Sequence, residues 1–326
     1  MKDRNLLFDN IKGLLIFLVV FGHSLELLKN NYEIAKIIYT FIYIFHMPAF
    51  IFISGYFSKN LKKSQDTAFE KFLIPFLLIT LPWNIVLVLL GITDFYSFFT
   101  PAWAMWYLYS MFVWKLILPY ILKIKNIFKV CLFLGILAGL FIEFNDFMSI
   151  SRTITFLPYF LAGYFFDETL IDKIKNKKHI IFVLLILLTF TLSVIFSLSD
   201  SIPVEILWLD RPFINLKYPI RLGLVIRIIL YFLGFLMTFA LINITTCKQC
   251  FLSKIGKNTL SVYILHIFLI GSFFGISKSI NNNILNLLLC TISSIIVTYI
   301  LSRDAVNNTV LRFLTFITNK IMYKEH

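Results

Sequence analysis

Charged residues are scarce in this chain: only 14% of its 326 residues are Asp, Glu, Lys or Arg, whereas about 25% of a typical soluble domain is charged. Hydrophobic residues make up 59% of the sequence. Apolar runs of about 18 residues or more recur along it, and each is long enough to cross a bilayer as a helix. The composition therefore excludes an ordinary soluble protein and predicts an all-α fold, a polytopic transmembrane helical bundle in the cell membrane.

Cysteine is also sparse, and the four present do not form a disulfide framework. Cys247 and Cys250 have the spacing of a redox or zinc motif, but no second pair or nearby histidine completes it. Three histidines fall within predicted spans without a cluster of Asp or Glu on adjacent helices, so no metal is expected. A small-residue cleavage site is missing after the first apolar run, so we expect that run to be kept as a span.

The positive charge that is present follows a membrane pattern. The formal net charge is +13, but the sequence has no nucleic-acid-binding motif, so no nucleic-acid partner is expected. Lysine and arginine concentrate in alternate loops, as the positive-inside rule requires of cytoplasmic loops. This asymmetry predicts that both termini are cytoplasmic and that the number of spans is even.

Ten spans are predicted, at about residues 10–28, 34–57, 70–91, 102–122, 127–145, 153–168, 179–198, 222–243, 258–277 and 283–302. We interpret residues 1–302 as one membrane domain. Residues 303–326 combine apolar side chains with basic ones such as Arg312, Lys320 and Lys324, which predicts a cytoplasmic amphipathic tail, either a helix at the membrane surface or a partial re-entry into the membrane. Nothing in the sequence decides whether the chain forms a homo-oligomer.

The first span carries a polar stripe where a membrane helix should avoid charge. Asp9 and Lys12 lie near its start and His23 near its far end. Lys12 and His23 are separated by about three helical turns and a rise of about 16 Å, so they share one face of the helix. Asp9 precedes Lys12 by three residues and is expected to lie beside it. This stripe is the main functional signal in the sequence.

Other polar and aromatic residues within spans admit both structural and functional interpretations. His46 stands beside Pro48, which interrupts the hydrogen bonding of a helix; it either bonds a neighbouring helix or belongs to a site. Trp106 and Tyr107 lie at the depth of an aromatic belt. Arg152, at the outer edge of a span, suits snorkelling to the surface, and His266 lies near the middle of the ninth span.

Several stretches together resemble one family of membrane enzymes. The first is Lys12, ten further residues and His23, and the others are Phe45–Pro48, Phe52–Tyr56, Trp106–Leu108, Arg152 with Leu157–Tyr164, and Leu260–His266. Over about residues 5–302 the chain resembles the integral-membrane acyltransferase-3 family, in its fucose 4-O-acetylase-like branch. That family has a basic residue, ten others and a histidine in its first span. Many members have arginine at the position of Lys12. Lysine carries the same positive charge, but it lacks the planar guanidinium with which arginine binds a phosphate through two parallel hydrogen bonds.

The resemblance implies an O-acyltransferase, most simply an O-acetyltransferase. The donor would be cytoplasmic acetyl-CoA or another acyl-CoA, and the acceptor a hydroxyl of a cell-surface polysaccharide or its lipid-linked precursor. Histidine suits the base that takes the hydroxyl proton, because its pKa is near neutral. His23 is the predicted general base or transient acyl acceptor, with Glu26 holding its tautomer and His46 as a second candidate.

Binding residues are predicted around this base. Lys12, supported by Asp9, would contact a phosphate of the donor. Trp106 and Tyr107 would hold the sugar, and Arg152 a lipid phosphate. A different interpretation is a glycan or lipid exporter whose buried polar residues line a path. It explains the spans equally well, but not the spacing of Lys12 and His23.

Overall fold

The structure is a computed structural model that describes residues 5–89, 91, 100–101, 103–141, 147–199, 202–278 and 280–321. All regular elements in these residues are helices, which confirms the predicted all-α class. The chain divides into two compact units, which are described separately below. Parts of the predicted spans 70–91, 102–122 and 127–145, and the end of the predicted tail, lie outside the described residues.

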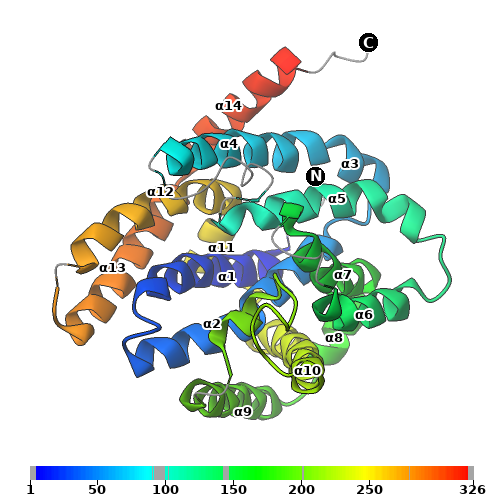
Figure 1. Cartoon of the computed structure of the whole chain (residues 1–326). Coiled ribbons are helices and arrows are strands. Elements are labelled where there is room, and N and C mark those ends of the chain that lie inside the picture. Colours follow the sequence, from blue (N-terminus) through cyan, green and yellow to red (C-terminus); the bar gives the residue numbers. More distant parts are fainter. Residues whose placement is uncertain are drawn as a thin grey trace. The chain divides into compact units, whose positions relative to one another are not determined.

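The first unit comprises Met1–Ile53, Phe165–Leu207 and Ile228–Asn307. Within it, α1 packs against α11, α12 and α13, and α12 packs against α13 (Figure 1). Its elements are α1 (Leu6–Ser24), η1 (Leu25–Leu27), most of α2 (Glu33–Tyr56), α8 (Glu168–Lys175), α9 (His179–Leu198), most of η7 (Val204–Trp208), most of α10 (Ile220–Ile244), α11 (Phe251–Lys257), α12 (Thr259–Lys278) and α13 (Asn283–Leu301).

The second unit comprises Ser54–Tyr164, Trp208–Arg227 and Asn308–His326. Within it, α5 packs against α3, η2 and α4. Its elements are the end of α2, α3 (Leu61–Asp66), the π-helical turn η2 (Phe69–Leu73), α4 (Ile74–Leu89), η4 (Trp103–Met105), α5 (Trp106–Ile121), α6 (Ile127–Leu137), η5 (Ala138–Leu140), η6 (Phe147–Ser149), nearly all of α7 (Ile150–Phe165), the start of α10 and most of α14 (Asp304–Ile321).

A helix lies within each of the ten predicted spans. Six segments of the described residues are long and apolar enough to cross a membrane, namely Leu6–Leu27, Glu33–Tyr56, Leu61–Leu89, His179–Leu198, Ile220–Ile244 and Asn283–Leu301. Ile127–Leu140 and Thr259–Phe273 are shorter apolar helices, and α5 and α7 have 16 residues each. The membrane location is thus supported, while the total of ten spans and the side of the termini remain predictions.

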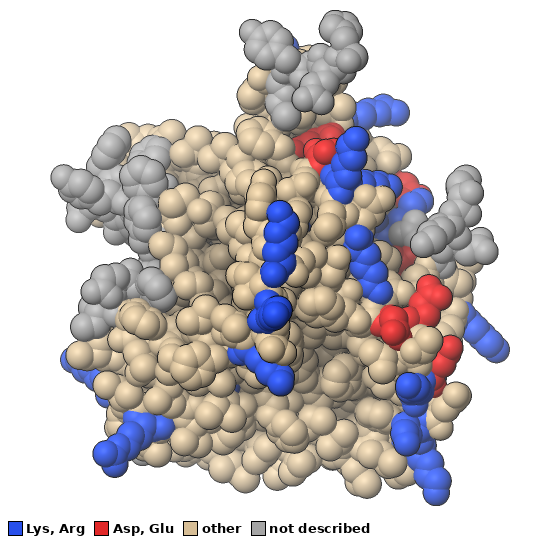
Figure 2. Space-filling view, turned by 90° about the vertical axis from the view of Figure 1, so that its right-hand side faces the viewer, with Lys and Arg blue, Asp and Glu red and all other residues tan. Residues whose placement is uncertain are grey.

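The exposed surface agrees with a lipid environment. Of the residues in α9, only Thr189, Ser193 and Ser197 are buried, and its exposed side chains are mainly leucine and isoleucine. On the face shown in Figure 2, lysine and arginine side chains lie at the centre, along the right-hand side and at the lower left, and the areas between them carry no charged side chain. Such apolar surface is stable against hydrocarbon, where charged side chains are costly.

Two charged residues within the second unit face its interior. Lys115 is buried and donates hydrogen bonds to the hydroxyls of Ser58 and Ser64, at 3.1 and 2.8 Å. Arg227 is 2% exposed, and its guanidinium lies 4.9 Å from the centre of the Phe213 ring. Both side chains therefore connect segments of this unit, a structural role that explains why they are tolerated within apolar helices.

Candidate active site

The polar stripe of α1 begins with an ion pair. Asn5 caps the helix by accepting a hydrogen bond from the backbone N–H of Phe8. One turn later, Lys12 Nζ lies 2.9 Å from Asp9 Oδ1. The Asp9 carboxylate is almost fully buried and the Lys12 side chain is partly exposed. The i, i+3 spacing therefore produces the contact that we expected.

A short helix, α11, covers this end of α1. The side chain of Asn10 donates to the carbonyls of Thr246 and Lys248, at 2.8 and 2.9 Å, and accepts from the Cys250 thiol. Cys250 is also the N-cap residue of α11, where it forms a capping box with Ser253. The cysteine spacing noted in the sequence thus has a structural explanation: one of the two cysteines begins a helix and joins it to α1.

His23 lies near the other end of α1, half-buried among aromatic side chains. The Tyr43 hydroxyl is 3.5 Å from His23 Nδ1 and 3.3 Å from Glu26 Oε1, to which it donates. Tyr39 donates to the same carboxylate oxygen at 3.2 Å. A hydroxyl that gives its proton to Glu26 can only accept from His23, which places the imidazole proton on Nδ1 and leaves Nε2 with a lone pair. Tyr43 thus connects Glu26 to His23.

A lysine in the loop after η1 adds positive charge near Glu26. Lys29 is buried, and its ammonium lies 4.8 Å from the centre of the Tyr39 ring. Burial lowers the pKa of Lys29, and the negative charges of Glu26 and Glu205 partly oppose that effect. The Glu26 carboxylate therefore accepts hydrogen bonds from two tyrosine hydroxyls and has the Lys29 ammonium nearby.

The two other histidines within predicted spans both bond to their own helices. His46 is 3% exposed and its Nδ1 lies 2.8 Å from the Ile42 carbonyl. His266 is fully buried, with Nδ1 at 3.0 and 2.8 Å from the carbonyls of Val262 and Tyr263. A carbonyl only accepts, so Nδ1 carries the proton in both rings. Helix α2 continues through Pro48 to Tyr56.

His266 is the neighbour of His23 that sequence reasoning did not place in the site. The two ring centres are 5.4 Å apart, and His266 Nε2 is a buried atom without a hydrogen-bond partner in the described part of the chain. A buried polar atom without a partner costs free energy and therefore calls for an explanation, of which a role in the chemistry of the site is one. Its signal in the sequence was an imidazole inside an apolar span, but spacing along the chain cannot pair it with α1.

The predicted acceptor residues belong to the second unit. The Arg152 guanidinium donates to Asp210 Oδ2 at 3.0 Å and to the Trp208 carbonyl at 3.1 Å, and it lies 5.3 Å from the centre of the Trp106 ring. Arg152 therefore bonds the 208–219 segment rather than snorkelling alone. The Tyr107 hydroxyl lies 2.8 Å from the Ser54 hydroxyl. Trp106 and Arg152 are brought together, while Tyr107 bonds the end of α2.

Comparison with known proteins gives a family match. The sequence model of the acyltransferase-3 family, described as "Acyltransferase domain", matches residues 5–303. Two relatives carry the name nodulation protein NolL. The protein from Sinorhizobium fredii is 41% identical over 63 residues, which cover 18% of this chain and 17% of the relative. The protein from Mesorhizobium japonicum is 44% identical over 68 residues, 19% of this chain and 18% of the relative. Each match thus spans less than a fifth of the relative, and no solved structure matches the chain.

Proposed function

The chain belongs to the acyltransferase-3 family and is a membrane acyltransferase; from this premise we propose the substrates, the base and the binding residues. The donor is cytoplasmic acyl-CoA, with acetyl-CoA as the first candidate. The acceptor is a hydroxyl of a cell-surface polysaccharide or of its lipid-linked precursor. Residues 1–302 act as one membrane acyltransferase domain, and residues 303–326 form its cytoplasmic tail.

The observation that carries this proposal is the environment of His23. In the proposed reaction, Nε2 takes the proton of the acceptor hydroxyl while the hydroxyl oxygen attacks the thioester carbonyl. The carbon–sulfur bond then breaks, and the thiolate of CoA leaves with the proton returned from His23. Glu26, acting through Tyr43, holds the proton on Nδ1 and stabilises the imidazolium that forms. His46 is too buried to be the first base, and it supports the Tyr43 ring, whose centre is 4.8 Å from its own.

The remaining assignments follow the charge of the groups involved. Lys12 contacts a donor phosphate, and Asp9 orients it. Trp106 and Tyr107 bind the sugar, since aromatic rings pack well on sugar faces. Arg152 binds a lipid phosphate, which replaces part of its contact with Asp210. Asp210 keeps its other partner, Arg211, at 3.1 Å.

Acetyl transfer by the purified chain is the direct test. The full-length protein in lipid nanodiscs is given acetyl-CoA labelled in the acetyl group together with a hydroxyl-bearing glycan or lipid-linked sugar. We expect release of CoA and label in the acceptor as an ester. An exporter would move the acceptor across a vesicle membrane without any dependence on acetyl-CoA, and that result would contradict the proposal.

Replacing Tyr43 by phenylalanine is expected to lower kcat about tenfold and to leave the KM for acetyl-CoA unchanged. The variant removes the hydroxyl between Glu26 and His23 but keeps the ring, so the imidazole loses its orientation and the donor site is untouched. Steady-state kinetics measure both constants. Tyr39→Phe is the matched control, because it removes a hydrogen bond to Glu26 and leaves Tyr43 in place; equal losses in the two variants would refute the role of Tyr43.

Replacing Lys12 by methionine is expected to raise the KM for acetyl-CoA about tenfold and to lower the Tm. The Tm falls because the buried Asp9 carboxylate loses this ion pair, and removing one partner of a buried pair is costly. The double variant Asp9→Asn/Lys12→Met removes the stranded charge, so it should regain the Tm without regaining the KM. If the double variant regained both the Tm and the KM of the wild type, Lys12 would act only by stabilising the fold.

A further inference from the structure

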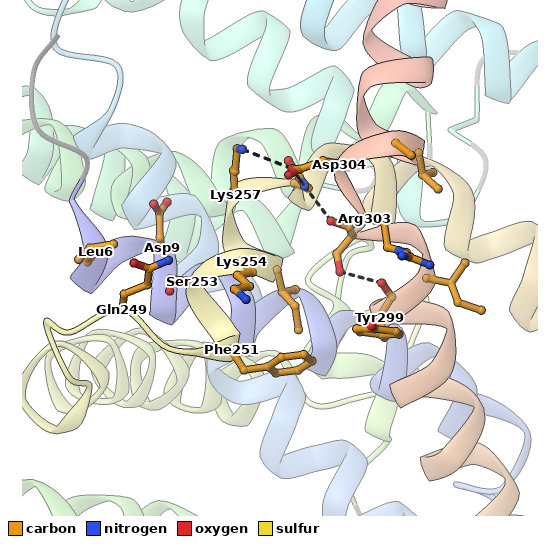
Figure 3. Close-up of a pocket in the computed structure, with 16 residues that line it drawn as sticks. Leu6, Asp9, Gln249, Phe251, Ser253, Lys254, Lys257, Tyr299, Arg303 and Asp304 are labelled. Carbon is orange, nitrogen blue, oxygen red and sulfur yellow. Dashed lines mark hydrogen bonds and ion pairs between the residues drawn. The ribbon is translucent and has the colours of Figure 1, made fainter.

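A cavity of about 900 Å³ lies at the start of α1, where Asp9 forms part of its lining. One wall comes from α11, with Phe251, Lys254 and Lys257, and the other from the end of α13 and the start of α14, with Tyr299, Arg303 and Asp304 (Figure 3). Every lining residue belongs to the first unit. The volume is in the range of about 300–1,000 Å³ that holds drug-sized ligands.

The charges of this cavity favour an anion. Three cationic side chains line it, Lys254, Lys257 and Arg303. Lys257 Nζ lies 3.3 Å from Asp304 Oδ1, and the other lining carboxylate, Asp9, is paired with Lys12. Within the described ranges, neither Lys254 nor Arg303 has a carboxylate partner. Two positive charges therefore remain for a ligand, and phosphate is the anion for which arginine and lysine are best suited.

The cavity also has a flat aromatic surface. The rings of Phe251 and Tyr299 are stacked, with their centres 6.0 Å apart and their planes at 22°. About half of each side chain is exposed, 56% for Phe251 and 49% for Tyr299. A planar base can stack on such a surface, and base stacking on aromatic side chains contributes about 1–3 kcal/mol per base. A ligand with both a planar base and several phosphates would use both features.

We propose that this cavity holds the phosphate-bearing adenosine end of the acyl-CoA donor, with Lys254 and Arg303 on its phosphates and Phe251 or Tyr299 against its base. The inference rests on the proposed function, because it takes acyl-CoA as the donor. From Asp9 to His23 the rise along α1 is about 21 Å, so the extended arm that follows the nucleotide can run along this helix toward the base. A lipid headgroup shares the phosphate chemistry but has no planar base for the ring pair.

The test measures nucleotide binding separately from catalysis. Adenosine 3′,5′-bisphosphate is titrated by calorimetry into the full-length protein in phosphatidylcholine nanodiscs. The variant Lys254→Glu/Arg303→Glu should bind it at least tenfold more weakly than the wild type. The matched control is Lys173→Glu/Lys178→Glu, which makes the same change in net charge at exposed residues of the same unit and should stay within twofold of the wild type.

Three results would overturn the inference. These are no binding by the wild type at millimolar nucleotide, equal binding by the wild type and the cavity variant, and an equal loss in the control. Native mass spectrometry of protein loaded with phosphatidylglycerol distinguishes the lipid source. A cavity variant that loses bound phosphatidylglycerol but keeps its nucleotide affinity would make the cavity a lipid site.

Measurements with a second acyl donor show whether the cavity assignment fails or the proposed function fails. S-acetyl-N-acetylcysteamine has the thioester but neither phosphates nor adenine. The cavity variant should show a KM for acetyl-CoA at least tenfold higher and an unchanged rate with the short thioester. If the wild type transfers acetyl from both donors and the two KM values of the variant are unchanged, the cavity assignment fails and the acyltransferase stands. If the wild type uses neither donor, the proposed donor fails, and nucleotide binding alone decides the cavity.

Discussion

Replacement of His23 by glutamine is expected to lower the rate of acetyl transfer by about 10³-fold without lowering the amount of folded protein in the membrane. Glutamine is similar in length and can still bond the Tyr43 hydroxyl, so the surroundings of the side chain are kept. It has no group that accepts a proton near neutral pH, and a positioned general base contributes about 10²–10⁴-fold to a rate. The initial rate of label transfer from acetyl-CoA measures the effect.

A histidine of the same unit provides the control for this substitution. His179 begins α9, and its Nδ1 lies 2.5 Å from Asn243 Oδ1. His179→Gln should keep the transfer rate within about twofold of the wild type, because the residue lies at the start of a helix that contributes nothing to the proposed site. A His23→Gln variant that is as active as His179→Gln would remove His23 from the chemistry.

The same assay separates His23 from its two histidine neighbours. His46 is 3% exposed and its Nδ1 is bonded to its own helix, so His46→Gln should reduce the rate less than His23→Gln. His266 is fully buried and its ring centre lies 5.4 Å from that of His23. It can hold the His23 ring in place, but a buried imidazole is poorly exposed to an acceptor. A larger loss in His46→Gln than in His23→Gln would reverse the assignment.

The helical fold and the Asp9–Lys12 contact could be predicted from the sequence, because both depend on residues that lie close together in the chain. Apolar runs fix where helices form in a membrane, and a helix lies within each of the ten predicted spans. The Asp9–Lys12 contact follows from a spacing of three residues on one helix. The match of the family model to residues 5–303 confirms the family that the Lys12 and His23 spacing had indicated.

The rest of the site depends on how separate helices pack. Tyr43 and His266 come from α2 and α12, and a periodic pattern does not say which faces of two apolar helices meet. Helix α11 was missed for another reason. It has only seven residues, too few for a clear periodic pattern, and it lies in a segment that we interpreted as a loop. The cavity inference depends on this helix, so it could come only from the structure.

Replacing Gly256 by alanine is expected to lower the stability of the first unit by an amount at the upper end of about 1–3 kcal/mol, the range for overpacked contacts. Gly256 lies in α11 against α1, where a Cβ would collide with the backbone carbonyl of Asp9. A Cβ on Gly13 of α1 would likewise collide with the carbonyl of Leu252. The obstructing atoms are backbone, so a side-chain rotation cannot relieve either contact, and one helix must move.

That movement should affect function as well as stability, because α11 forms one wall of the cavity and Asp9 supports Lys12. We therefore expect Gly256→Ala and Gly13→Ala each to lower the Tm in detergent and to raise the KM for acetyl-CoA. Gly271→Ala is the matched control: Gly271 lies in α12, and a Cβ there has no neighbour within 4 Å. Because alanine favours a helix over glycine by up to about 1 kcal/mol, this control should be neutral or slightly stabilising. A Gly256→Ala variant with the Tm and KM of the Gly271→Ala control would show that α11 does not pack closely on α1.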